Sequence, residues 1–413
     1  MESSETVTIE QCEKILRNYL GHQQFKDGTY KVTPISKLDG FIGKQHHLWI
    51  SYETDLRRDT KRFFLKTLNE SNPVMLKLSK EIKAYEKEAF FYETLVPVLF
   101  SKDIYLGDIV PKCYLCEDDI IVLEDLATAS YRTAIKNESL DVHHCKRCLE
   151  TLAKFHAYPI IFEILKSREL GRCYYLTEDY GDILDDKVFT EEGSGASQFF
   201  QYSIEGLYNL IDILPERTID KEVFIEKLQE MLNIMMSAKN GSSCRQTVLH
   251  GDLWGNNFMF KYGEEGIEDC KLIDFQTVKY GPLAFDLLQF VMTNTRRSMR
   301  KEHESDLLQH YYDYFSKLLT RQGFRPDEIL TEREFADACN IFRLPAKIQA
   351  VVDRSITLIP EEKYLEASKS EEAFSKFIFE ERSKYMVEAF NSSSTYRDIM
   401  TEDIIELNEM LIE

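Results

Sequence analysis

The chain lacks any run of about 18 apolar residues, so no segment is expected to span a membrane. Its first residues, Met1 to Cys12, are polar and acidic, and they lack the basic start and apolar core of a signal peptide. These two absences predict a cytoplasmic protein. The sequence also lacks the G-x-x-x-x-G-K-[S/T] loop, which excludes a P-loop nucleotide site.

Positive charge is scarce. Against 71 Asp and Glu the chain has 51 Lys and Arg, and its formal net charge is −20. Nucleic acids and anionic membrane surfaces attract surfaces rich in Lys and Arg, so neither is expected as a partner. A few local cations and a metal ion can still hold phosphates inside an acidic protein, so a nucleotide ligand remains compatible with this charge.

The number of cysteines is nine, and an odd number favours reduced thiols over a disulfide framework. Two C-x-x-C pairs, Cys113/Cys116 and Cys145/Cys148, raise the alternative of a zinc site. The pairs are 28 residues apart, whereas the usual spacing in zinc ribbons is roughly 15–20. We therefore favour unrelated, buried thiols.

Hydrophobic periodicity predicts a β-rich part followed by a mostly helical part. Before residue 127 we expect a helix at 9–20, strands at 45–52 and 60–68, a helix at 76–95 that Pro97 ends, and a hairpin at 112–126. Beyond it we expect helices in 141–158, 196–239 and 300–413, with strands inserted at 247–276. The pattern predicts an α+β fold.

The segment from His250 to Asp274 carries the strongest chemical pattern. Asp252 and Asn257 are five positions apart, and a second strand ends at Asp274. The two strands are joined by a glycine-bounded turn, so they are expected to pair and bring Asp274 beside Asn257. Two oxygen side chains at that separation can share one Mg²⁺. An H-x-D-x-x-x-x-N pattern followed by a strand-end Asp is the order that kinases use.

In this interpretation Asp252 is the catalytic base, Asn257 and Asp274 bind Mg²⁺, and ATP supplies the phosphate. We assign His250 to the catalytic loop as a structural brace. Each residue taken alone could instead be a turn or a cap. A rival chemistry, in which His250 and Asp252 bind a hydrolytic metal, lacks a second cluster with ligand spacing.

A kinase also needs a lysine on a strand that is paired to a glutamate on the next helix. Lys66 and Glu88 suit these roles best, and Lys77 with Glu81 is the alternative pair. Two further sets are expected to contact the nucleotide. They are Gly40 and Gly43 in a loop over the phosphates, and the backbone of Glu124 and Leu126 in a hinge beside adenine.

These motifs resemble the ecdysteroid kinase-like family, a branch of the aminoglycoside phosphotransferase and choline kinase group. The resemblance covers roughly residues 35–330. Trp254 after His-Gly-Asp-Leu, and Gln276 after Asp-Phe, are specific to this branch. The segments that carry the resemblance are Gly40–Gly43, Phe64–Lys66, Tyr85–Glu88, Phe91–Tyr92, Val122–Leu126, Leu152–Ala157, His250–Asn257, Ile273–Gln276, Gly281–Pro282 and Phe285–Leu287.

The resemblance implies a two-lobed protein-kinase-like fold, with a nucleotide-binding N-lobe at 1–126 and a helical C-lobe at 127–413. It implies ATP-dependent phosphorylation of a small-molecule hydroxyl, in some family members a hydroxyl of an insect moulting steroid. By position it assigns the lobe-bridging ion pair to Lys66 and Glu88, and it gives Asp286 the task of bracing the catalytic loop.

Three functions remain open at this point. The first is a kinase for an ecdysteroid or a related apolar alcohol, whose pocket would lie between 196–239 and 330–390. Aromatic residues there would line the pocket or form ordinary helix core (Phe199, Phe200, Tyr202 and Tyr208). The second is a choline- or ethanolamine-type kinase. The third is a non-catalytic binding protein on the same fold. The sequence gives no oligomeric state.

Overall fold

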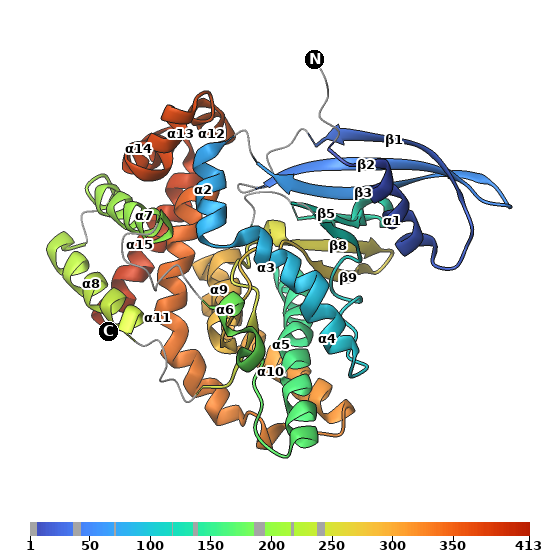
Figure 1. Cartoon of the computed structure of the whole chain (residues 1–413). Coiled ribbons are helices and arrows are strands. Elements are labelled where there is room, and N and C mark those ends of the chain that lie inside the picture. The colour runs from blue at the N-terminus through green and yellow to red at the C-terminus, as the bar shows by residue number, and fades with distance from the viewer. Residues whose placement is uncertain are drawn as a thin grey trace. The chain divides into compact units, whose positions relative to one another are not determined.

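The computed structural model describes residues 6–35, 43–69, 72–117, 119–134, 139–185, 195–215, 219–237 and 244–413. Contacts within the chain divide it into two units, which we describe one at a time (Figure 1). The first unit comprises Met1–Ala134 and Asn256–Gln276, and the second comprises Ile135–Gly255 and Thr277–Glu413. The chain therefore passes from one unit to the other within the segment that carries the catalytic pattern.

An antiparallel sheet of five strands, in the order β1-β2-β3-β5-β4, forms the centre of the first unit. The strands are β1 (Lys26–Pro34), β2 (Gly43–Glu53), β3 (Arg58–Leu68), β4 (Cys113–Glu117) and β5 (Ile120–Glu124). Strands β2 and β3 and the β4–β5 hairpin confirm the predicted elements. All of β5 except its last residue is buried, as its run of apolar side chains predicts.

Strand β1 was not predicted, because glycine and proline are rare in strands and β1 contains both. The register of β1 against β2 shifts between Asp27 and Tyr30, where Gly28 lies. A Cβ on Gly28 would come within 2.2 Å of the Ser51 carbonyl oxygen, so glycine alone fits this approach to β2.

Helix α1 (Ile9–Leu20) lies where the sequence predicts it and packs against β4. Thr8 begins the helix with a capping box that it forms with Gln11. The apolar face of α1, which includes Ile15 and Leu16, joins Phe63 of β3 in the core of the first unit. Burial of each such side chain contributes about 1.5–3 kcal/mol.

The single helix predicted at 76–95 is wrong in two respects. Lys83 adopts a left-handed conformation (φ 54°) that separates α2 (Pro73–Glu81) from α3 (Ala84–Phe90). A π-helical turn (Phe91–Leu95) then continues into α4 (Val96–Phe100), so Pro97 does not end the helix. Proline is tolerated there because it occupies the first turn of α4, where its missing N–H would have had no partner in α4.

A second sheet in the first unit has the order β6-β8-β9, with strands β6 (Tyr131–Thr133), β8 (Phe258–Gly263) and β9 (Gly266–Leu272). The hairpin of β8 and β9 confirms the predicted pairing, and its register sets Phe258 opposite Leu272. Strand β6 was not predicted, because three residues are too few to show an alternating pattern.

The second unit is mostly helical and has one two-stranded sheet of β7 (Gln246–Leu249) and β10 (Lys279–Pro282). Its helices are α5 (Val142–Leu170), α6 (Thr177–Leu184), α7 (Gly195–Ile211), α8 (Lys221–Ser237), α9 (Leu283–Asn294), α10 (Arg297–Arg321), α11 (Glu332–Thr357), α12 (Glu361–Ala367), α13 (Glu371–Phe379), α14 (Arg382–Ser392) and α15 (Ser394–Ile412). Helix α9 is almost entirely buried and packs on α11, while α10 packs along α5 (Figure 1). The α+β fold is therefore confirmed. No helix within the described ranges is both long and apolar enough to span a bilayer.

Buried ion pairs join α11 to α15. Lys347 Nζ lies 2.7 Å from Asp403 Oδ1, and Arg354 Nη1 lies 3.0 Å from Asp403 Oδ2. Lys347 also donates to Glu406 at 2.5 Å. One acidic residue of α15, Asp403, thus binds two cations of α11, and a second, Glu406, also pairs with Arg300 of α10.

Candidate active site

Lys66 lies in the middle of a buried ion-pair cluster in the first unit. It occupies β3 between β2 and β5, and 7% of the residue is exposed. Its Nζ donates to Glu88 Oε2 of α3 at 2.6 Å and to Asp274 Oδ1 at 2.8 Å. The alternative pair, Lys77 and Glu81, is a surface contact at 3.9 Å with the lysine side chain 77% exposed. The structure therefore contains the predicted pair of Lys66 and Glu88.

The charge of Lys66 is fixed by its surroundings. Burial alone would favour the neutral amine, but the carboxylates of Asp274 and Glu88 outweigh it and raise the pKa of Lys66 above its ordinary value. The side chain therefore stays an ammonium at physiological pH. A buried cation with two anchoring carboxylates is suited to contact a phosphate without moving.

Asp274 is held by the elements around it. It has a left-handed backbone (φ 69°), which aspartate tolerates better than most residues. The next N–H, that of Phe275, donates to Glu88 Oε1 at 3.3 Å. The Phe275 ring stacks on Phe91 with centroids 3.7 Å apart and an interplanar angle of 9°. The π-helical turn that the sequence did not predict therefore carries the aromatic platform beneath this strand end.

The β8–β9 hairpin places Asn257 next to the strand end that carries Asp274. The Ile273 N–H donates to the Asn257 carbonyl oxygen at 3.0 Å, one residue before Asp274. Asn257 is buried, and the Asp274 side chain is 25% exposed. One carboxylate and one amide oxygen fit Mg²⁺, which takes few protein ligands and completes its shell with phosphate oxygens and water.

No group of three or more His, Cys, Asp or Glu side chains within the described ranges could hold a metal ion. The cysteines of the two C-x-x-C pairs form no disulfide. Burial raises the pKa of Cys116 and of Cys145 to about 12, which favours the thiol over the metal-binding thiolate at these two positions. No ligand set for zinc or for a hydrolytic metal is present in that part of the chain.

The loop that carries Asp252 lies in the second unit and is anchored by Asp286 of α9. Asp286 is fully buried, and its carboxylate accepts the N–H groups of His250 at 2.8 Å and of Gly251 at 3.0 Å. His156 of α5 hydrogen-bonds to the same carboxylate at 3.1 Å and to the Tyr311 hydroxyl at 2.7 Å. The contact that the family resemblance implied for Asp286 is present.

Hydrogen bonds keep the Asp286 carboxylate charged. Burial would raise its pKa, but the hydrogen bond and charge of His156 and the His250 N–H outweigh burial, so the pKa of Asp286 lies below its ordinary value. His250 also acts within the loop, since its Nδ1 lies 3.3 Å from the Asp252 N–H. Both contacts agree with a structural task for His250. The contributions of His156 and Tyr311 were missed, because they lie about 90 and 60 residues from the loop in sequence.

Gly251 gives the loop a conformation that other residues would strain. Its φ is +80°, and a Cβ would lie 2.6 Å from the Thr277 carbonyl oxygen. The Thr277 hydroxyl in turn donates to the His250 carbonyl at 2.8 Å. The loop is therefore closed against the segment that follows Gln276.

The predicted hinge begins at Glu124, the last residue of β5. The Glu124 N–H donates to the Lys112 carbonyl at 2.7 Å, and Leu126 is buried at the start of a 3₁₀ turn. Asp125 lies between them and is 3% exposed. Its side chain accepts from the Ala127 N–H at 3.1 Å, forms an ion pair with Arg62, and lies 3.2 Å from His47 Nδ1. Asp125 therefore anchors the hinge between the two predicted residues, a role that its sequence position did not indicate.

Of the predicted phosphate loop, Gly40 lies outside the described residues and Gly43 begins β2. Gly43 lines a cavity of about 10 Å³ together with Lys66, Glu88, Tyr85 and Gln276. A volume of this size holds about one water molecule. The structure thus brings Gly43 and the branch-specific Gln276 to the Lys66–Glu88 pair.

A model of the ecdysteroid kinase-like family matches residues 37–324. The chain belongs to this family. The recognition made from the sequence is therefore confirmed, and with it the α+β, two-lobed protein-kinase-like fold class.

Similar proteins are small-molecule kinases by name. A methylthioribose kinase of Bacillus cereus (strain B4264) is 24% identical over 270 residues, which are 62% of this chain and 60% of the relative. The chain thus spans about three fifths of the length of the curated relatives it matches. Among solved structures, an ethanolamine kinase of Plasmodium vivax has 11% identity and a TM-score of 0.40 (89% of this chain, 83% of that chain). The aminoglycoside phosphotransferase APH(2'')-Ib has 12% identity and a TM-score of 0.39 (95% and 99%).

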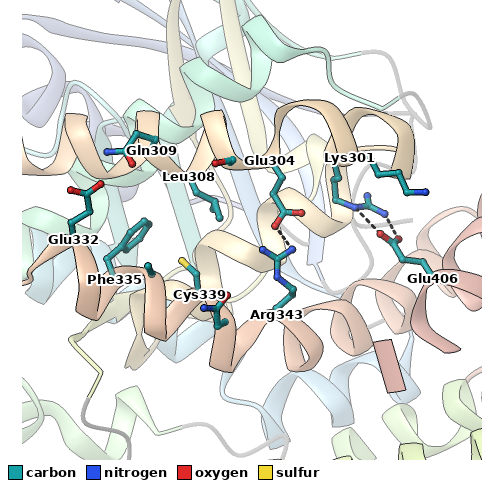
Figure 2. Close-up of a pocket in the computed structure, with 13 residues that line it drawn as sticks. Lys301, Glu304, Leu308, Gln309, Glu332, Phe335, Cys339, Arg343 and Glu406 are labelled. Atoms are coloured by element: carbon teal, nitrogen blue, oxygen red, sulfur yellow. Dashed lines mark hydrogen bonds and ion pairs between the residues drawn. The ribbon is translucent and has the colours of Figure 1, made fainter. Parts of the chain in front are cut away.

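A pocket of about 430 Å³ opens between α10 and α11 of the second unit (Figure 2). None of the residues predicted for catalysis or nucleotide binding lines it. Its charged groups meet in pairs: Glu304 pairs with Arg343, as Figure 2 shows, and Arg300 pairs with Glu406. We assign no part of the reaction to this pocket.

The aromatic residues expected to line an acceptor pocket contribute to helix packing. The Arg382 guanidinium lies 3.9 Å from the centroid of the Phe199 ring, and Tyr208 meets Phe224 edge-on at 6.5 Å. Phe200 is buried. These contacts favour ordinary helix core, the alternative that the sequence left open.

Proposed function

We propose that the chain is a cytoplasmic kinase that transfers the γ-phosphate of ATP to a hydroxyl of an ecdysteroid or a related apolar alcohol. The observation that carries the proposal is the cluster of Lys66, Glu88 and Asp274, with Asn257 beside it. Membership of the ecdysteroid kinase-like family supports the reaction class. The proposal includes an N-lobe at 1–126 that binds the nucleotide and a C-lobe at 127–413 that binds the acceptor.

In this proposal each polar residue of the site has one task. Lys66, held by Glu88, contacts the α- and β-phosphates of ATP. Asn257 and Asp274 hold the Mg²⁺ that neutralises charge on the phosphates. Asp252 orients the acceptor hydroxyl and accepts its proton. Asp286 keeps the backbone of the Asp252 loop in place through two N–H groups.

The retained residues argue against a non-catalytic binding protein. A protein of this family that only binds its ligand could lose the lysine, the base or a metal ligand. All four residues that a kinase needs are present (Lys66, Asp252, Asn257 and Asp274). Activity is therefore the expectation to test.

The test is turnover of Mg·ATP with a panel of acceptors: ecdysone, methylthioribose, choline, ethanolamine and a phenolic alcohol. We expect phosphorylation of a neutral alcohol, and we expect Asp252→Asn to lower kcat at least about 100-fold, the usual contribution of a general base. Equal turnover by the wild type and Asp252→Asn would refute the base. If no acceptor were phosphorylated and ATP did not bind, the non-catalytic binding protein would become the better explanation.

A further inference from the structure

A polar cluster of α9 and α11 lies one contact away from the catalytic loop, within the second unit. The Gln289 Nε2 of α9 lies 3.5 Å from the Gly251 carbonyl oxygen and 3.2 Å from Asp353 Oδ2 of α11. The other oxygen of Asp353 accepts from Gln349 Nε2 at 2.8 Å. The carboxylate is therefore connected to the residue before Asp252 through a single amide side chain.

The polar cluster of Asp353 and Gln289 destabilises the fold. Burial raises the pKa of Asp353 to about 6, although two amides donate to the carboxylate and Lys279 attracts it. Gln289 is 2% exposed, and its Oε1 has no hydrogen-bond partner among the described residues. A buried acceptor without a donor and a carboxylate with a raised pKa both destabilise a fold. Groups with perturbed pKa values gather at functional sites.

Aromatic side chains and one cation flank the cluster. Phe285 lies one turn before Gln289 on α9, about 6 Å along the helix axis, and its ring meets that of Phe342 of α11 edge-on at 6.2 Å. The Lys279 Nζ lies 5.4 Å from the centroid of the Phe285 ring. The Lys279 Cε lies 3.4 Å from where a Cβ of Gly251 would be, so this lysine passes beside the catalytic loop.

The position of Lys279 restricts the charge of a ligand. A cation–π site binds an ammonium over the face of an aromatic ring. At Phe285 this position is occupied by the ammonium of Lys279. A cationic amino alcohol would meet a like charge there. An uncharged alcohol would meet half-buried aromatic rings and a half-buried carboxylate that accepts hydrogen bonds.

We propose that Asp353, Phe285 and Lys279 form the acceptor-binding surface and select an uncharged, ring-containing alcohol with at least two hydroxyl groups. The buried Gln289 links Asp353 to the catalytic loop. One hydroxyl is presented to Asp252, and a second donates to Asp353. Lys279 excludes choline-like acceptors. The inference rests on the proposed function and names the substrate class and the residues that choose it. Asp353 acts here as a positioning residue that binds the acceptor without taking part in proton transfer.

The first experiment compares Asp353→Asn with the wild type on the best neutral alcohol of the panel. We expect the KM for that alcohol to rise at least about tenfold, because a hydrogen bond to a charged group is lost. The KM for ATP should stay within twofold, and the melting temperature should rise because a buried charge is removed. A purely structural residue would lower the melting temperature without separating the two KM values.

The control is Asp337→Asn, which changes a solvent-exposed aspartate on the same helix. It should alter neither KM. If wild type phosphorylates a neutral alcohol and Asp353→Asn keeps its acceptor KM, this inference is refuted and the kinase proposal stands. If wild type phosphorylates no alcohol, both are refuted.

A second experiment tests the charge rule with Lys279→Met, which keeps the length of the side chain and removes the charge. The measured quantity is kcat/KM for choline divided by kcat/KM for the neutral alcohol. We expect this ratio to rise at least about tenfold, because removing roughly 1.4 kcal/mol of like-charge repulsion changes the ratio by that factor. An unchanged ratio, or a wild-type preference for choline, would overturn the assignment of Lys279.

Discussion

The ammonium of Lys66 pairs with two carboxylates, so a substitution that removes this ammonium affects both of them. Lys66→Met would leave Glu88 and Asp274 facing each other without a cation in a buried site. We expect kcat/KM for ATP to fall at least about 100-fold, as when a single charge-stabilising group is removed from an active site. Steady-state kinetics with varied ATP would measure this loss.

The matched control for that substitution is Lys77→Met on α2, since Lys77 pairs with its glutamate on the surface. It should leave kcat/KM within twofold. If the two substitutions lowered activity equally, Lys77 and Glu81 would again be candidates for the catalytic lysine–glutamate pair.

Gly251 and Gly323 allow steric crowding in the catalytic loop to be separated from backbone strain. Their φ values are +80° and +79°, yet only a Cβ on Gly251 would meet other atoms, the Thr277 carbonyl oxygen at 2.6 Å. Gly323→Ala should therefore cost roughly 1–2 kcal/mol of unfolding free energy from its left-handed backbone alone. Gly251→Ala should cost more and should lower kcat, because the loop must shift.

Chemical denaturation and steady-state kinetics of both alanine variants would check this comparison. If Gly251→Ala and Gly323→Ala lost the same unfolding free energy and Gly251→Ala kept its kcat, the crowding around Gly251 would have no measurable effect. The catalytic loop would then accommodate a methyl group at this position.

At the scale of elements, the ion pairs between α11 and α15 make stability depend on pH. Burial would raise the pKa of Asp403, but Arg354 and Lys347 outweigh it and lower the pKa from 3.8 to about 2. Because the folded value is depressed, the carboxylate stabilises the fold above about pH 4. That contribution, on the order of 2 kcal/mol, is lost as the pH falls from about 4 to about 2.

Asp403→Asn should remove this part of the pH dependence and should destabilise the protein at pH 7 by about 3–5 kcal/mol, because two buried cations lose their partner. Urea unfolding at pH 7 and at points between pH 4 and pH 2 would measure both effects. The control is Asp398→Asn, which changes an exposed residue of the same helix. A pH dependence that Asp403→Asn leaves intact would place the acid-sensitive group elsewhere.

At the scale of the whole molecule, ligand binding should show itself in thermal stability. Nucleotide that binds only the folded state at 100 times its Kd adds about 2.7 kcal/mol to the unfolding free energy. We expect Mg·ATP to raise the melting temperature and EDTA to remove most of that rise. Asp274→Asn should weaken the response to magnesium more than the response to ATP alone.

Differential scanning fluorimetry with ATP, Mg·ATP and Mg·ATP plus EDTA would separate these effects. If Asp274→Asn responded to magnesium like the wild type, the proposed magnesium ligands would be wrong. The formal net charge of −20 disfavours binding of nucleic acid, so small ligands remain the expected partners.

Elements that the sequence predicted well are those in which one pattern dominates locally. Helix α1 carries its own capping box and apolar face, and β5 is a short apolar run beside a turn. Elements that were missed depend on contacts outside their own segment. Strand β6 is held by β8, and Gly28 of β1 fits only because Ser51 approaches it. The break at Lys83 is a left-handed residue with no glycine to indicate it.

The sequence by itself determined the family, the α+β fold class and the pairing of the hairpin that joins Asn257 to Asp274, because spacing within one short segment specifies them. Only the tertiary structure decided that Lys66, rather than Lys77, is the buried cation. It also brought His156 and Tyr311 to the carboxylate of Asp286. The physical reason is that burial and ion pairing depend on which distant segments pack together, and no local pattern records that packing.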